Sequence, residues 1–270
     1  MTVVVTGATG LVGRRLVERL RLEGEPVRAV TRDPGRARLP GDVEVVQGDL
    51  GSPERMAEVF AGADRLHLMT THEPAQLDAA PAVARSARDA GVRRVTVMSG
   101  GGDETQLDAV RAAGLPWTHL QPGEFMANTL DWAHQIRDQE VVRAPFGGWL
   151  SAMIHEDDIA AVAQAALTSG GHDGDTYILT CEEELTRVEV VRLIGAAIGR
   201  DIRFEELTPE QARSYWTSEE GYPDEVVDWF LELGSGPGPV SAATKTIREV
   251  TGRPARTFAE WAEEHADDFR

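Results

Sequence analysis

The sequence has little of several features that would point to a particular class of protein. It contains one cysteine, Cys181, and therefore cannot form an internal disulfide. Lys245 is its only lysine, which nearly excludes lysine-based catalysis. No apolar run is long enough to span a bilayer, and residues 1–5 look like a buried strand and not like a signal peptide. These absences predict a cytoplasmic protein that does not act in a membrane.

Positive charge is also scarce. Lys and Arg together number 27 against 45 Asp and Glu, which gives a formal net charge of -18. Phosphate backbones would repel such a chain, so we expect no nucleic-acid partner. With 270 residues, 41% of them hydrophobic, the chain can bury a sizeable core in one large domain or in a main domain with a smaller lobe. No spacing typical of a metal site appears, and we expect no metal.

Short β-rich runs alternate with amphipathic segments of helix length up to about residue 122. The runs are "TVVVT", "PVRAV", "VEVVQ", "RLHLM", "RRVTVM" and "PWTHLQ", and helical spacing occurs near 11–22, 53–61, 76–90 and 104–113. Further on, "HEDDIAAVAQAALT" predicts a helix with an acidic first turn, and "DTYILT" predicts one more strand. Repeated alternation of this kind predicts an α/β fold, a doubly wound parallel sheet of the Rossmann type.

The end of the regular alternation suggests how the chain is divided. We expect residues 1–150 to form a nucleotide-binding Rossmann domain, to which the helix and strand within 155–180 return. Helices dominate after residue 183, around one short strand, "DIRFEE". Residues 181–270 are therefore predicted to form a smaller, mostly helical C-terminal lobe for substrate.

The strongest motif is "VVVTGATGLVGRRLVERL" at the N-terminus. Gly7, Gly10 and Gly13 directly follow a predicted strand and open an amphipathic helix. Gly7 permits a tight turn, Gly10 lets the backbone approach a pyrophosphate, and Gly13 lets the helix pack closely on the sheet. The helix N-terminus would offer N–H groups to the phosphates. A structural turn without ligand is the alternative, and this context favours a dinucleotide.

The end of the second strand indicates which nucleotide. An acidic side chain there would bind an adenosine ribose, whereas a guanidinium would pair with a 2′-phosphate. Arg32 comes first after the apolar run, with Arg36 and Arg38 nearby. Asp33 remains an alternative that would serve NAD, but it precedes a proline, as turn aspartates often do. We therefore expect NADP(H).

Several segments in order resemble the NmrA-like branch of the atypical short-chain dehydrogenases/reductases. They are "TGATGLVG", "RDP", "QGDL", "AGVRRVTVMSG", "QPGEFMAN" and "HEDDIAAVA", and the resemblance covers nearly the whole chain. It implies a Rossmann domain that binds NADPH across the strand ends, with a small C-terminal substrate lobe. The residues that it implies at the cofactor are the three glycines with Thr9, Leu11 and Val12, Arg32, Asp49 and Leu50 beside the adenine, Met69 and Thr70 on the adenosine side, and Ser99 on the nicotinamide side. Strand-end packing and turn capping are the alternative roles for the last five.

The chain lacks the acid of typical short-chain reductases. Those enzymes use a Tyr with a Lys four residues later, and the ammonium lowers the pKa of the phenol. Tyr177, Tyr215 and Tyr222 are not followed by Lys, and none lies in the helix after Ser99. Ser99 keeps the position of a serine that orients a substrate carbonyl. We therefore expect the proton to come from the substrate or from water.

Two classes of function fit a complete glycine motif without an acid. The first is an NADPH-dependent reductase of a small conjugated or polycyclic carbonyl or a quinone, whose delocalised charge needs less acid assistance. The second is an NADP(H)-binding redox sensor without turnover, the one case in which we expect a protein partner. The reductase is favoured because the C-terminal lobe is large and apolar enough to enclose a small molecule.

A substrate pocket over the nicotinamide would use residues that follow the strand ends. The predicted pocket residues are His72, Phe125, Met126, Asn128, His155 and Trp216. Packing in a core is the alternative for the aromatic residues among them. His72 and His155 are also possible replacement acids, whereas His67 lies inside an apolar strand and is interpreted as a core histidine.

Overall fold

The structure, a computed structural model, describes residues 2–70, 74–100, 103–235 and 242–270. It divides into two compact units, each made of three segments. The first unit comprises Met1–Pro122, Glu156–Leu179 and Thr246–Arg253. The second comprises Gly123–His155, Thr180–Lys245 and Pro254–Arg270.

The first unit is built on a seven-stranded sheet in which all the paired neighbours run parallel. Its strands are β1 (Thr2–Val5), β2 (Val27–Thr31), β3 (Glu44–Gln47), β4 (Ala63–Met69), β5 (Arg94–Met98), β6 (Trp117–Pro122) and β9 (Thr176–Leu179). Their order is β3-β2-β1-β4-β5-β6-β9, so the direction of winding reverses between β1 and β4. Ligands of such sheets bind beyond the carboxyl ends of the strands near that reversal. The predicted doubly wound α/β fold is confirmed.

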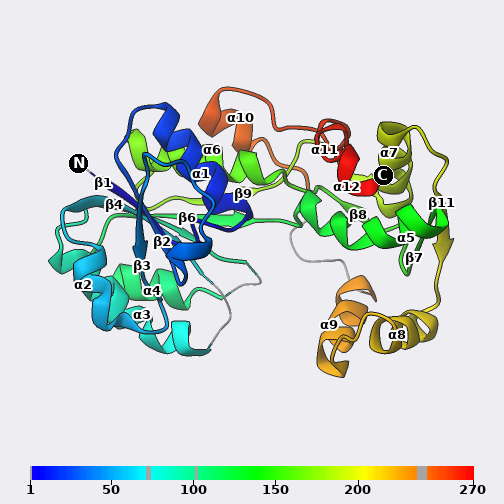
Figure 1. Cartoon of the computed structure of the whole chain (residues 1–270), viewed down its shortest axis with the longest axis horizontal. Coiled ribbons are helices and arrows are strands. Elements are labelled where there is room, and N and C mark those ends of the chain that lie inside the picture. Colours follow the sequence, from blue (N-terminus) through cyan, green and yellow to red (C-terminus); the bar gives the residue numbers. More distant parts are fainter. Residues whose placement is uncertain (1, 71–73, 101–102, 236–241) are drawn as a thin grey trace. The chain divides into compact units, whose positions relative to one another are not determined.

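Helices cover both faces of this sheet (Figure 1). One face carries α1 (Leu11–Leu22), α6 (Glu156–Thr168) and α10 (Thr246–Thr251), and the other carries α2 (Met56–Val59), α3 (Pro74–Asp89) and α4 (Thr105–Ala112). Two short 3₁₀ turns, Pro34–Arg36 and Pro53–Arg55, follow β2 and β3.

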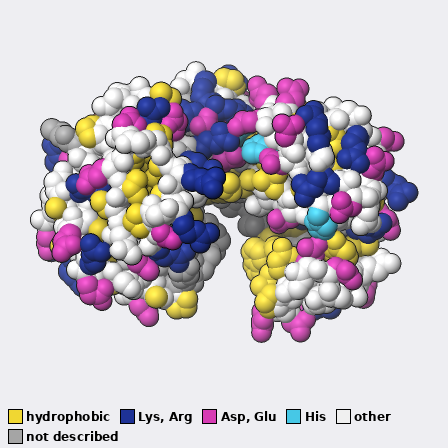
Figure 2. Space-filling view, viewed as in Figure 1, with side chains coloured by type: hydrophobic (Ala, Val, Ile, Leu, Met, Phe, Trp, Pro, Cys, Tyr) yellow, Lys and Arg dark blue, Asp and Glu magenta, His cyan; other side chains and the backbone are white. Residues whose placement is uncertain are grey.

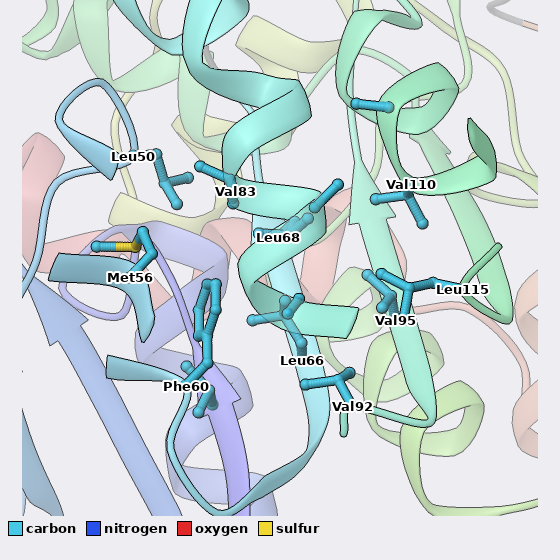
Figure 3. Close-up of a cluster of buried hydrophobic side chains, with 14 of the residues drawn as sticks. Leu50, Met56, Phe60, Leu66, Leu68, Val83, Val92, Val95, Val110 and Leu115 are labelled. Carbon is cyan, nitrogen blue, oxygen red and sulfur yellow. The ribbon is translucent and has the colours of Figure 1, made fainter. Parts of the chain in front are cut away.

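The core between the sheet and α2, α3 and α4 is apolar and continuous (Figure 3). Phe60, Leu66 and Leu68 are almost fully buried in it, together with Val83 of α3 and Val110 of α4. Strands covered on both faces are expected to read as near-continuous apolar runs. The runs from which the strands were predicted have this pattern, which explains why their positions were found.

Ion pairs fasten α6, whose acidic first turn is buried. Arg19 of α1 donates to both carboxylate oxygens of Asp157, at 2.7 and 2.5 Å. Arg253, which follows α10, lies 2.8 Å from the carboxylate of the fully buried Asp158. Carboxylates in the first turn also complement the helix dipole. The "EDD" sequence therefore attaches α6 to α1 and to the segment after α10.

The second unit is mostly helical. Its helices are the 3₁₀ helix η3 (Met126–Trp132), α5 (Ala133–Gln139), α7 (Arg187–Ile198), α8 (Pro209–Ser218), α9 (Asp224–Ser235), α11 (Phe258–Glu264) and α12 (Ala266–Phe269). Two small sheets complete it: β7 (Val141–Ala144) pairs in parallel with β11 (Arg203–Glu206), and β8 (Leu150–Ser151) pairs antiparallel with β10 (Leu185–Thr186). Trp261, Phe258 and Phe269 form the aromatic part of its core.

An aromatic group lies on α8 and α9. The ring centroid of Phe230 lies 5.6 Å from that of Trp216 and 5.1 Å from that of Trp229. Trp229 is 54% exposed, and hydrophobic side chains gather on the surface over α9 (Figure 2).

The division differs from the predicted one in two segments. Residues 123–150, expected in the Rossmann domain, belong to the second unit, because Met126 donates to Ile154 and β7 pairs with β11. Residues 246–253, expected in the C-terminal lobe, return to the first unit, because α10 packs on α6 and β9. The helix and strand within 155–180 do return to the sheet, as the sequence predicted. Within the described ranges, no helix is both long enough and apolar enough to cross a membrane.

Candidate functional site

The glycine loop joins β1 to α1 at the reversal of strand order. Gly7 has a φ of +61°, which side chains rarely allow, and a Cβ there would lie 2.9 Å from the side chain of Met69. A Cβ on Gly13 would lie 2.1 Å from the carbonyl oxygen of Gly7. Both positions therefore require glycine, and the loop and the first turn of α1 form a cradle that side chains would fill.

The N-terminus of α1 is open to a ligand. Its N-cap is Gly10, no side chain caps the helix, and its first turn contains no acidic residue. Thr9 is exposed and Leu11 is 48% exposed, whereas Val12 is buried. Backbone N–H groups at such an end, together with the helix dipole, favour a phosphate. The cradle therefore fits the pyrophosphate of a dinucleotide.

At the end of β2, the aspartate and the arginine have different roles. The Asp33 carboxylate accepts the backbone N–H of Gly35 at 3.0 Å and caps the 3₁₀ turn that follows. It is thus used locally, as the following proline suggested. Arg32 is exposed, and its backbone carbonyl accepts a hydrogen bond from Gln47 of β3 at 3.3 Å. Arg32 therefore stays the predicted partner of the nucleotide's 2′-phosphate.

A cavity of about 250 Å³ opens at the ends of β2 and β3. It is lined by Arg32, Gln47, Gly48, Asp49, Ser52, Glu54 and Arg55. The sequence reasoning missed Arg55, whose side chain is 59% exposed and lies 3.5 Å from Glu58. The sequence signal that could have identified it is a second basic residue in the turn after the third strand. Two guanidinium groups at one cavity suit a phosphate on the adenosine ribose.

The side chains of the residues after β3 make structural contacts within the first unit. The Asp49 carboxylate accepts the backbone N–H of Gly51 at 2.9 Å, which caps the turn. Leu50 is 7% exposed and packs in the core beside Met56 and Val83 (Figure 3). The structure thus accounts for Leu50 by packing, whereas Asp49 also lines the cavity.

The end of β4 is tied to its neighbours on both sides. The backbone N–H of Met69 donates to the Thr6 hydroxyl at 2.9 Å, and Thr70 donates through both its N–H and its hydroxyl to the carbonyl of Met98. Met69 and Thr70 therefore lie beside the glycine loop and the end of β5. His72 lies outside the described residues.

Ser99, directly after β5, has a partner that the sequence reasoning did not single out. Its hydroxyl lies 2.6 Å from Nε2 of His119 on β6, and both side chains are buried. His119 was read as one residue of the apolar run "PWTHLQ". Burial lowers the pKa of His119 below its ordinary value, with smaller opposing effects of Glu104 and Arg111, so the imidazole is neutral near pH 7.

The tyrosines have environments opposite to that of a catalytic acid. Burial, and then hydrogen bonding to Asp175, raises the pKa of Tyr177 to about 12. Burial and Glu220 raise the pKa of Tyr215 to about 12 in the same way, and burial raises that of Tyr222. None therefore has the lowered pKa that a reductase tyrosine needs.

The remaining predicted pocket residues all belong to the second unit. Phe125 pairs with Ile154, the residue before His155, and the backbone N–H of the buried Met126 donates to the carbonyl of Ile154. His155 is fully buried, with Nε2 3.2 Å from a carboxylate oxygen of Glu264. Asn128 is exposed on η3, and Trp216 lies in the aromatic group of α8 and α9.

The comparison with protein families identifies the chain. The model of the NmrA-like family matches residues 1–234, which is most of the sequence. The chain belongs to the NmrA-like family. The predicted resemblance is thereby confirmed.

Similar proteins span the whole length of this NmrA-like protein. It is 38% identical to the (4-alkanoyl-5-oxo-2,5-dihydrofuran-3-yl)methyl phosphate reductase of Streptomyces griseus, over 99% of both chains. It is 34% identical to an NAD(P)H azoreductase of Xenophilus azovorans, again over 99% of both. A solved structure, the NADPH-dependent quinone oxidoreductase of Escherichia coli, shares the fold with a TM-score of 0.82 and 23% identity, covering 98% of this chain and 99% of that one.

Proposed function

We propose that this NmrA-like protein is an NADPH-dependent reductase that delivers hydride to a small conjugated acceptor. The proposal rests on a glycine cradle that fits a dinucleotide, in a chain whose described tyrosines all have raised pKa values. Relatives that are 38% and 34% identical are named as reductases, which supports the same reaction class.

Residues of the first unit would hold the cofactor. The glycine loop and the N-terminus of α1 would receive the pyrophosphate, and Arg32 with Arg55 would receive the 2′-phosphate. Ser99, at the end of β5, would donate its hydroxyl to the acceptor on the nicotinamide side. NADPH supplies the hydride when it is bound, so the protein itself has mainly to orient the reactants.

The kind of acceptor follows from the missing acid. Hydride addition leaves a negative charge, and without a positioned general acid that charge has to be stabilised by the acceptor. The named substrates of the two relatives, an acyl furanone and azo compounds, are both conjugated acceptors in which such a charge is delocalised. Quinones have the same property. We therefore propose acceptors of this class, with the proton taken from water or from the acceptor's own acidic group.

The pocket that would hold the acceptor remains a prediction. Phe125, Met126, Asn128, His155 and Trp216 are proposed to contribute to it, and the contact between His155 and Glu264 makes a purely structural role for this histidine the simpler interpretation. His155→Asn should therefore leave most turnover intact. A general acid, in contrast, would cost at least about a hundredfold when replaced.

The proposal is tested by measuring NADPH oxidation at 340 nm with a panel of quinones, azo dyes and acyl furanones. We expect consumption faster than that of free cofactor with at least one acceptor class, without any partner protein. If no acceptor is reduced, and a protein partner is captured only with NADP+ or only with NADPH, the chain is a redox sensor and the reductase proposal is wrong.

A further inference from the structure

The hydrogen-bond partners of Ser99 and His119 determine which of these two buried side chains donates to the other. Ser99 Oγ and His119 Nε2 are 2.6 Å apart, so one of them must donate to the other. The other ring nitrogen of His119, Nδ1, is buried and has no hydrogen-bond partner among the residues that the structure describes. Neutral imidazole carries one proton, either on Nδ1 or on Nε2.

The unpartnered Nδ1 decides between the two tautomers. A proton on Nδ1 would leave a buried N–H without an acceptor, a situation that native structures rarely contain. A proton on Nε2 leaves only the lone pair of Nδ1 unsatisfied, and the Nε2–H can donate to the Ser99 oxygen. Glu104 and Arg111, the charged groups that act on His119 from the neighbourhood of α4, have opposite effects and do not overturn this choice.

The tautomer sets what Ser99 can do. If Nε2–H donates to Oγ, the hydroxyl hydrogen of Ser99 is free to point elsewhere, and the described residues offer it no other acceptor. If Ser99 donated to His119 instead, its hydroxyl hydrogen would be engaged within the protein and could not donate to the acceptor. A donor that itself accepts a hydrogen bond is also polarised and becomes a better donor.

We propose that His119 is a positioning residue, which donates Nε2–H to Ser99 and so commits the serine hydroxyl to donate to the acceptor as negative charge develops on it. This inference rests on the proposed reductase function. It assigns no proton transfer to His119. The histidine orients and polarises the serine, and the proton that completes the reaction still comes from water or from the acceptor.

The first test does not depend on activity. In protein labelled with ¹⁵N histidine, the resonances absent from His119→Gln identify the residue, and the Nε2–H tautomer is expected for it near pH 7. Ser99→Ala should shift the Nε2–H resonance, because its acceptor is removed. A proton on Nδ1 in the wild-type protein would overturn the inference even if no acceptor is reduced, so this result is separate from failure of the reductase proposal.

The second test uses kinetics with the best acceptor of the panel. We expect Ser99→Ala and His119→Leu each to lower kcat by about threefold to tenfold, since a neutral hydrogen bond is lost in each. His119→Gln, which keeps an N–H donor on a side chain of similar reach, should restore much of the loss. The double variant Ser99→Ala/His119→Leu should be no slower than Ser99→Ala.

A purely structural histidine would behave differently. Its replacement would lower thermal stability, and the resulting decrease in kcat would multiply with the decrease from Ser99→Ala. Glutamine at position 119 would not restore kcat. Such additivity would overturn the inference. If His119→Leu does not fold, the single variants Ser99→Ala and His119→Gln, with the tautomer of the wild-type protein, still decide the question.

Discussion

Arg32 is the residue on which the choice of cofactor is expected to depend. It lines the cavity at the ends of β2 and β3, whereas Asp33, the alternative reader of a ribose, caps a turn. A charge-assisted contact contributes on the order of 1.5–3 kcal/mol, so Arg32→Ala should weaken NADPH binding by about tenfold to a hundredfold and leave NADH binding nearly unchanged. Fluorescence titration of both cofactors measures this.

Arg36 provides the matched control. It is exposed in the same turn but does not line the cavity, so Arg36→Ala should change the affinity for either cofactor little. Arg55→Ala should share the selective loss of Arg32→Ala if both guanidinium groups meet the 2′-phosphate. Equal losses for NADPH and NADH in Arg32→Ala would show that the arginine does not distinguish them.

The tyrosines should be dispensable for turnover. Tyr177→Phe, Tyr215→Phe and Tyr222→Phe should each keep most of the wild-type kcat, because the pKa of each phenol is raised and none can act as an acid near neutrality. Steady-state rates with saturating NADPH provide the measurement. A collapse of kcat in one of them, with normal NADPH binding, would identify a protein acid that the structure gives no reason to expect.

The sequence was informative about some site residues and silent about others. The positions of Gly7, Gly13 and Arg32 were predictable because local backbone geometry and strand ends determine them. His119 was not, since its importance comes from a neighbouring strand whose register brings it to Ser99. The family resemblance implied a place for Leu50 at the adenine, and packing with residues of α2 and α3 accounts for its burial in the core.

At the scale of elements, the glycine loop holds α1 against the sheet through backbone contact. Gly13→Ala should therefore both destabilise the protein and weaken NADPH binding, because its Cβ would overlap the Gly7 carbonyl. Overpacking of this kind costs about 1–3 kcal/mol. Gly41→Ala is the control, since a Cβ at that position meets nothing and its φ is not positive. Thermal denaturation and cofactor titration of the two variants should differ; similar behaviour would mean that the loop adapts easily.

Elements were predictable where the local pattern was strong. The strands of the first sheet and the helices α1, α4 and α6 lie within a few residues of their predicted positions, because both faces of the sheet are buried. The short strands β7, β8 and β10 were missed. Each has two to four residues and forms only by pairing with a strand 34 to 62 positions away, as in the pairing of Val141 with Arg203. Local spacing contains no information about such a partner.

At the scale of the whole molecule, a buried histidine makes stability depend on pH. Burial lowers the pKa of His67 to about 4. In the unfolded chain it titrates near about 6.5, so the folded state binds fewer protons between these values. The free energy of unfolding should therefore be unaffected by His67 above about pH 6.5, fall as the pH drops through this window by on the order of 3 kcal/mol, and level off below about pH 4.

Urea denaturation at a series of pH values measures this effect. His67→Asn should show a shallower loss of stability between pH 6.5 and 4 than the wild-type protein, whatever its stability at neutral pH. Identical slopes in the wild-type protein and His67→Asn would exclude His67 as a source of acid sensitivity.

The two units are interleaved along the chain, which passes from one to the other after Pro122, His155, Leu179, Lys245 and Arg253. The last segment of the first unit lies beyond residue 234, where the match to the family ends, and it carries Arg253, the ion-pair partner of Asp158. A gene fragment that ended at that boundary would leave the sheet without α10 and this arginine. Any single division of the chain therefore separates segments that pack in the same core, so neither unit can be exchanged as one terminal module.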